Sequence, residues 1–266
     1  MFPNKKESIL LTLSLIVVQL LIGIYLGVVG VQWEAGNPIV YIMVSTLSTA
    51  VIVWFSLRKM KLKFDQLFHA KFNSIASVLT VILVPSILVV VGAQIILSNF
   101  FNAYYSIFPS ETVFTQEINA LLGSGFLGFL SVCLIAPIVE EIVFRGIILR
   151  GLLGNYKNGQ AIFISSALFS LYHINPDQLV HALLIGGFFG WLYVKTYSLW
   201  PSIIAHILFN LVAFLLSTSN IQLEGINYFP NNEIVYPSIL FQLIGFGSAF
   251  LGLLLLNGTF KNGGMS

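Results

Sequence analysis

The sequence predicts an all-α, polytopic membrane protein of about eight transmembrane helices. Hydrophobic residues make up 57% of its 266 residues and charged residues only 8%, whereas a soluble domain carries about 25% charged residues. The mean hydropathy is +0.93, and the excess lies in apolar runs near the length of about 20 residues that spans a bilayer as a helix. We therefore treat residues 1–266 as a single integral membrane domain.

Eight apolar runs define the predicted spans. In chain order they cover residues 8–31, 38–57, 75–98, 125–153, 160–174, 178–195, 199–217 and 236–257. The first run is longer than the apolar region of a signal peptide, about 7–15 residues, so we expect it to remain as a span. The fifth and sixth runs are short, and Pro176 between them would break a single long helix. Residues 99–124 are expected to lie outside the spans, with an interfacial helix starting near Ser110 or Glu111.

Basic residues set the predicted orientation, because Lys and Arg concentrate in cytoplasmic loops. With both termini inside, all 12 basic residues fall on the cytoplasmic half, from Lys5 and Lys6 before the first span to Lys261 after the last. The opposite loops carry only acidic charges: Glu34, Glu111, Glu117, Asp177, Glu224 and Glu233. The prediction is a multi-pass protein with a cytoplasmic N-terminus and C-terminus, in the cytoplasmic membrane if the host is bacterial. Seven spans would put Lys261 on the wrong side.

Several features are assigned to structure or exclude a function. No basic stripe stands outside the short loops, so no nucleic-acid partner is expected. The single cysteine, Cys133, excludes an intramolecular disulfide and a Cys-rich metal site. Gly186, Gly187 and Gly190 form a small-residue face on the sixth span, which favours close helix packing.

The fourth span carries three charged residues. An ionisable group near the bilayer centre costs at least ~2.5–3.5 kcal/mol on insertion scales, so each is a functional candidate. Glu141 and Arg145 are four residues apart, share one helix face and are expected to pair. Glu140, about 100° around the helix, is left without a local partner. The alternative interpretation is a structural ion-pair network that locks this span.

Two later spans bring polar side chains to a comparable depth. His173 ends the fifth span, and His206 and Asn210 lie one turn apart on the seventh. Glu140 lies 17 residues before Lys157, at the centre of the connecting loop, and His173 lies 16 residues after it. At ~1.5 Å per residue, the two reach nearly equal depth on neighbouring antiparallel helices. One cluster is therefore expected from Glu140, Glu141, Arg145, His173, His206 and Asn210.

This set of residues is chemically complete for hydrolysis. Glu140 can act as the general base for a water that His173 helps to position. His206 and Asn210 offer N–H donors on one helix face, suited to a developing oxyanion. The sequence has no Gly-x-Ser-x-Gly elbow, no His-Glu-x-x-His helix and no phosphate-binding Gly-rich loop. Serine hydrolases, zincins and nucleotide-binding proteins are therefore disfavoured.

Three motifs carry a family resemblance. Glu140-Glu141-x-x-x-Arg145, Phe169-x-x-x-His173 and His206-x-x-x-Asn210 resemble the motifs of the CPBP family. That family comprises CAAX-type prenyl endopeptidases related to the Ras-converting enzyme, and bacterial bacteriocin-processing and self-immunity proteins of the Abi group. The resemblance covers a protease core at about 126–215, flanked by N-terminal spans over 8–98 and a C-terminal span over 236–257.

The resemblance implies an intramembrane endopeptidase of eight helices that opens toward the cytoplasmic side. Its substrate would be a membrane-associated or lipidated peptide or protein, held in the lipid bilayer. Because the family is often named a metalloprotease, a zinc ion held by Glu140, His173 and His206 stays open. We favour hydrolysis without a cofactor, because Asn210 is a poor zinc ligand and the sequence shows no obvious carboxylate to orient either histidine.

Two other classes of function remain alternatives. A non-catalytic protein of the same fold, such as a bacteriocin self-immunity factor or a membrane scaffold, would not need the catalytic residues. A transporter or proton pathway also uses intramembrane Glu and His, but would be expected to show inverted repeats. The sequence shows no such repeat, and it does not determine the oligomeric state or the identity of the substrate.

Overall fold

The protein is built from helices and their connecting loops. The computed structural model describes residues 1–31, 36–68, 75–107, 113–227, 229 and 233–262. In a bilayer a helix satisfies its backbone hydrogen bonds within one segment, which is why apolar runs adopt it. The longer helices are α1 (Lys5–Val28), α2 (Pro38–Met60), α3 (Ile75–Ile107), α4 (Val113–Gly123), α8 (Asn158–Tyr172), α9 (Pro176–Thr196), α10 (Leu199–Thr218) and α11 (Ile239–Asn262).

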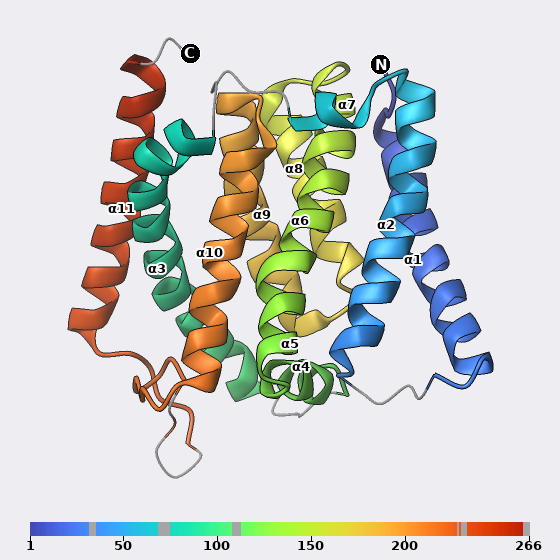
Figure 1. The fold of residues 1–266 in the computed structure, drawn as a ribbon. Helices are drawn as coiled ribbons and strands as arrows, with labels where there is room; N and C mark the ends of the chain where they lie inside the picture. The colour runs from blue at the N-terminus through green and yellow to red at the C-terminus, as the bar shows by residue number, and fades with distance from the viewer. Residues whose placement is uncertain (32–35, 69–74, 108–112, 228, 230–232, 263–266) are drawn as a thin grey trace.

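One continuous helix runs through the middle of the bundle from Phe126 to Leu153 (Figure 1). We call it the central helix; it matches the predicted span 125–153. Its consecutive parts are α5 (Phe126–Phe129), the π-helical η2 (Leu130–Ile135), α6 (Ala136–Glu141), the π-helical η3 (Ile142–Leu149) and α7 (Arg150–Leu153). All eight residues of η3 are buried, so this segment forms the centre of the core.

Among the described residues, seven helices are long and apolar enough to cross a membrane. They correspond to seven of the eight predicted spans. The eighth, predicted at 160–174, is α8, which has only 15 residues and a length of about 22 Å. Figure 1 shows both termini at the same end of the bundle, as an even number of passes requires.

Several boundaries differ from the prediction. The first span begins three residues earlier, at Lys5, where Asn4 and Glu7 form a capping box. The third span, predicted to end at 98, continues to Ile107. The interfacial helix, α4, begins at Val113; Ser110 and Glu111 lie outside the described residues. Hydropathy locates a span but not the polar turns that extend a helix beyond the bilayer.

Basic residues gather at one end of the bundle. The termini, the end of α2 and the start of α8 lie at this end (Figure 1), which we call the basic end. It carries Lys5, Lys6, Arg58, Lys59, Lys61, Lys63, Arg150, Lys157, Lys195 and Lys261. Helix α4, the end of α10 and the turn between α8 and α9 lie toward the opposite end, called the far end below.

Candidate active site

The central helix widens on both sides of the two adjacent glutamates. Ala136 donates its N–H to the carbonyl of Ser131, five residues back, and Pro137 has no N–H to continue this pattern. The carbonyl of Val132 therefore lacks its donor within the helix. The side-chain amide of Asn210 on α10 supplies one at 2.8 Å. Such π-helical turns are common at functional sites, and here one ties α10 to the central helix.

Glu141 lies at the centre of a buried network. Its Oε1 accepts from Arg145 Nη1 at 2.8 Å, and both side chains are completely buried. The expected Glu141–Arg145 pair is thus present. The same oxygen lies 3.0 Å from Nδ1 of His206 on α10, and Arg145 Nη2 donates to the carbonyl of Gly186 on α9 at 2.8 Å. One carboxylate and one guanidinium therefore join the central helix to α9 and α10.

Aromatic rings surround this network. Phe169 makes edge-to-face contacts with His173 and His206, with centroid separations of 4.8 and 5.8 Å. The guanidinium of Arg145 lies 4.7 Å from the Phe169 ring centroid, within the range of a cation–π interaction. Phe189 stacks on His206 at 4.6 Å. The sequence pointed to Phe169 only as part of a motif and did not point to Phe189, because an apolar residue in an apolar span gives no signal.

Gly186 is another site residue whose role the sequence did not reveal. A Cβ at this position would lie 3.0 Å from Phe169 and 3.2 Å from Arg145 Nη2, whereas a Cβ at Gly187 would meet nothing within 4 Å. Gly190 packs toward Ile162 and Leu149. The small-residue face therefore serves packing, as predicted, and at Gly186 it also leaves room for Arg145 to reach the carbonyl.

Glu140 faces a cavity of about 630 Å³, which we call the Glu140 cavity. Its wall is formed by α1, α2, α4, the end of α8 and the start of α9, together with Glu140 from the central helix. Glu140 is 7% exposed, and its Oε2 lies 3.8 Å from Nε2 of His206. That separation is an ion-pair distance and too long for a hydrogen bond. Glu140 therefore has an oxygen directed at open space, unlike Glu141.

His173 lies on the same cavity wall, at the C-cap of α8. Its Nδ1 lies 2.8 Å from the carbonyl of Phe169. A carbonyl can only accept, so Nδ1 carries the hydrogen and Nε2 presents a lone pair. No direct hydrogen bond joins His173 to Glu140 in the described part of the chain. The two line the same cavity of about 630 Å³.

The predicted cluster divides into two groups. Glu141, Arg145 and His206 are joined directly, whereas Glu140 and His173 line the cavity beside them. Asn210 belongs to neither group, because it donates to the Val132 carbonyl. The sequence offered no obvious carboxylate to orient either histidine, and this expectation is wrong for His206, since Glu141 is bound to its Nδ1. The contact joins residues 65 apart, which no local pattern reveals.

The three residues considered for zinc do not form a metal-binding group. Among the described residues, no group of three His, Cys, Asp or Glu side chains is placed to hold a metal ion. Glu140 and His206 approach each other at 3.8 Å, whereas His173 comes from the C-cap of another helix. This arrangement does not fit a two-histidine, one-carboxylate site, which needs about 2.0–2.2 Å from each ligand to the metal.

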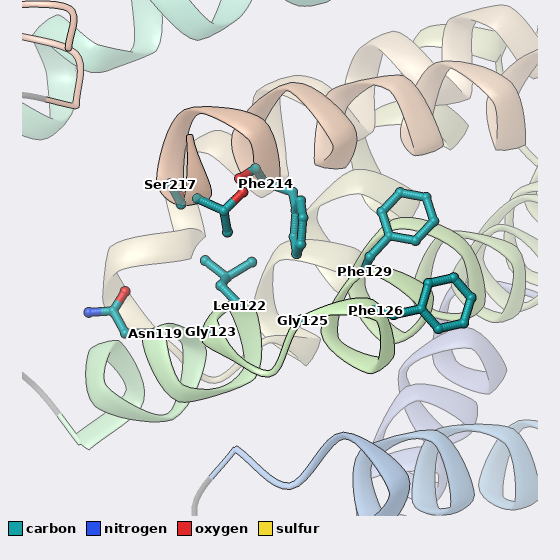
Figure 2. Close-up of a pocket in the computed structure, with 9 residues that line it drawn as sticks. Asn119, Leu122, Gly123, Gly125, Phe126, Phe129, Phe214 and Ser217 are labelled. Carbon is teal, nitrogen blue, oxygen red and sulfur yellow. Dashed lines mark hydrogen bonds between the residues drawn. The ribbon is translucent and has the colours of Figure 1, made fainter. Parts of the chain in front are cut away.

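A second cavity of about 630 Å³ lies at the far end and contains none of the predicted site residues. Figure 2 shows Phe129 and Phe214 on its wall, between the central helix and the end of α10. Their rings meet edge to face with a centroid separation of 5.8 Å. Asn119 and Leu122 of α4 line the opposite side. It offers no ionisable side chain for catalysis, so the Glu140 cavity remains the candidate active site.

The Glu140 cavity lies on the far-end side of the bundle. Its wall uses the second half of α1 and the first half of α2, both remote from the basic end. The family resemblance led us to expect an opening toward the cytoplasm, and the basic residues led us to expect the basic end in the cytoplasm. These two expectations cannot both hold, because the cavity and the basic residues lie at opposite ends.

The fold and the site together define an integral, multi-pass, all-α membrane protein with a buried Glu–Arg–His cluster beside a cavity. Residues 122–212 match the family model described as Type II CAAX prenyl endopeptidase Rce1-like. This segment contains all three motifs and both groups of the cluster. The resemblance to the CPBP family that the motifs predict is therefore confirmed over this segment.

A curated relative is similar over a longer stretch. The chain is 30% identical over 141 residues to the "Putative membrane peptidase YdiL" of Bacillus subtilis (strain 168). The match covers 53% of this chain and 54% of the relative, so it spans about half of that protein's length. No solved structure matches this chain.

Proposed function

We propose that this protein is an intramembrane endopeptidase of the CAAX-type and bacteriocin-processing family, with Glu140 as its general base. One observation carries the proposal: Glu140 is the ionisable group of the central helix that lines the cavity, while its neighbour Glu141 is completely buried and is held through Oε1 by Arg145 and His206. The substrate is a membrane-associated or lipidated peptide or protein. We also propose that both termini lie in the cytoplasm, as the basic end suggests.

The proposed reaction uses a water held between Glu140 and His173. Nε2 of His173 accepts one O–H of this water, and Glu140 removes the other proton as the oxygen attacks the scissile carbonyl carbon. The carboxylic acid then returns this proton to the leaving amide nitrogen, which breaks the C–N bond. The Glu141–Arg145–His206 network keeps the second carboxylate from competing for the water, because its charge is already neutralised.

Tyr172 is better placed than Asn210 to donate a hydrogen bond to the oxyanion. Its hydroxyl accepts from Gln19 Nε2 at 2.6 Å, which leaves the O–H of Tyr172 available to donate. Both side chains line the Glu140 cavity. Asn210, by contrast, already donates to Val132. We propose that Tyr172 stabilises the oxyanion and that Asn210 holds the central helix.

We propose that this reaction needs no cofactor. The separation of His173 from the Glu140–His206 pair supports water activation by side chains, because zinc would require all three to converge on one point. The Glu141–His206 contact resembles the carboxylate–histidine pairs that support metal ligands elsewhere. It serves equally to orient His206 between the two glutamates.

The test is a comparison of peptides in membranes of cells that carry the wild-type protein or its Glu140→Gln variant. The amide keeps the size of the carboxylate but cannot accept the proton, so we expect the cleavage products to disappear. Glu224→Gln, at an exposed position, is the matched control and should retain them. Cleavage by Glu140→Gln at the wild-type rate would refute the assigned base.

A non-catalytic self-immunity or scaffold protein is the second candidate function. The match with the curated peptidase covers 53% of this chain and 54% of that relative, so it does not by itself carry a peptidase activity over to this chain. This alternative predicts that Glu140→Gln and His173→Gln keep the cellular phenotype while no peptide changes. If the protein is an endopeptidase, these variants lose the cellular phenotype and the cleavage products together.

A further inference from the structure

Access to Glu140 is open on one side of the bundle and closed on the other. On the far-end side, the cavity wall includes Ile24, 64% exposed, and Ile174, 56% exposed, whereas Glu140 is 7% exposed. The exposed fraction of the lining side chains therefore falls from the rim of the cavity toward Glu140. On the basic side, the residues that follow Glu141 are all buried, from Ile142 to Leu149. In the part of the chain that the structure describes, the exposed rim of the cavity therefore lies on the far-end side.

The short helix α8 produces this asymmetry. It starts at the basic end and, with 15 residues, ends after about 22 Å. His173 and Asn175 in the turn that follows lie on the cavity wall, as does Gln178 at the start of α9. The turn therefore contributes to the cavity wall, with Ile174 at its exposed rim. Figure 1 shows α1 and α2 diverging toward the same end, and residues of both helices line the cavity.

The charge distribution assigns the far end to a side of the membrane. The described termini and loops at the basic end carry ten Lys and Arg residues, from Lys5 to Lys261. The described loop between α10 and α11 at the far end carries Glu224 and Glu233 and no basic residue. Because Lys and Arg are retained in the cytoplasm, the far end faces outward.

The wall of the cavity limits what can bind. Of the residues that line it, Glu140 is the acidic one, and none is Lys or Arg. A free C-terminal carboxylate would enter without a cationic partner, next to Glu140, at a large desolvation cost. Gln19, Asn37, Ser45 and Gln178 offer polar groups suited to the backbone of an extended peptide. The wall therefore suits an internal peptide bond.

We infer that the Glu140 cavity opens on the extracytoplasmic side of the membrane and receives an internal stretch of a membrane-anchored polypeptide from that side. The inference rests on the proposed function and adds the side of entry and the class of substrate. Glu140 lies 14 residues along the central helix from Phe126, about 20 Å from the far end. The cleaved bond then lies between the middle of a substrate's span and its outer end.

Cysteine labelling tests, without a substrate, on which side of the membrane the cavity opens. Gln178→Cys introduces a thiol on the cavity wall, and Lys157→Cys introduces one at the basic end. The natural Cys133 is fully buried, so the unsubstituted chain gives the background. With a membrane-impermeant maleimide, Gln178→Cys should react in intact spheroplasts, and Lys157→Cys only in inverted vesicles. The opposite pattern would overturn the outward orientation whether or not the protein is a protease.

The substrate class is tested by mapping new protein N-termini in membranes of cells with wild-type protein or Glu140→Gln. Sites lost in the variant should be internal and lie between the middle of a span and its outer end. Sites on the cytoplasmic side, or sites that release only a few C-terminal residues, would overturn this inference and leave the endopeptidase proposal standing. If no site depends on Glu140, the proposed function itself fails.

Discussion

Glu140 and Glu141 are adjacent in the sequence, yet their surroundings give them different tasks. Glu141 is fully buried and shares one oxygen between Arg145 and His206. Removing one partner of such a buried ion pair costs about 3–5 kcal/mol, so we expect the replacement of Glu141 to act chiefly on stability. Glu140 meets a single distant partner and open space. A helix that turns by about 100° per residue separates the two roles.

Tyr172→Phe gives a prediction at the residue scale. The ring of Tyr172 packs 5.4 Å from Phe144, and phenylalanine keeps that contact while removing the hydroxyl. If the hydroxyl stabilises the oxyanion, kcat should fall by about 100- to 1,000-fold, as for other oxyanion donors, with little change in KM. Kinetics on a cleaved reporter peptide measure both constants.

The matched control for Tyr172→Phe is Tyr25→Phe, on the exposed face of α1 and 64% exposed. This variant should keep the wild-type kcat. An unchanged kcat in Tyr172→Phe would assign the oxyanion to another donor. A rise in KM alone would assign Tyr172 to substrate binding.

At the scale of elements, the widened central helix explains why Asn210 is present. Pro137 removes the N–H that would otherwise reach the Val132 carbonyl, and Asn210 replaces it from α10. Leaving a buried acceptor unpaired costs about 1–3 kcal/mol. Asn210→Ala should therefore lower the free energy of unfolding by roughly that amount, measured by thermal unfolding of the purified protein.

A second substitution separates this positioning role from a catalytic one. Pro137→Ala restores an N–H next to the Val132 carbonyl, so the double variant should recover part of the stability and activity lost in Asn210→Ala. Non-additivity of this kind identifies groups that share a partner. If Asn210 were an oxyanion donor, Asn210→Ala would lower kcat at unchanged stability, and Pro137→Ala would rescue nothing.

Sequence patterns predict the local parts of this structure and miss the parts that depend on assembly. The Glu141–Arg145 pair follows from a spacing of four residues, and the spans follow from hydropathy. The contact between His206 and Glu141, by contrast, joins two helices, and the role of Asn210 depends on a π-helical turn that propensity does not reveal. The side on which the cavity opens depends on where α8 ends relative to its neighbours, which only the packed bundle determines.

At the scale of the whole molecule, the site exists only because helices from separate parts of the chain converge. Glu140 comes from the central helix, His173 from the end of α8 and His206 from α10. Their mutual distances are fixed by the packing of the bundle, since protein interiors are close-packed and tolerate little displacement. His173 is held at the end of α8 by the Phe169 carbonyl, and Phe169 also contacts Arg145.

The whole-molecule prediction is that catalysis survives the removal of metal ions. Protein purified with a strong chelator should keep its cleavage rate and its unfolding temperature, because the proposed reaction uses side chains and water alone. Zinc content measured on the same active sample should be well below one ion per chain. Stoichiometric zinc, together with activity that chelators remove and added zinc restores, would show instead that α8 moves to complete a site of Glu140, His173 and His206. Since zinc binding would also stabilise the folded bundle by mass action, a zinc-dependent rise in the unfolding temperature would report the same rearrangement independently of activity.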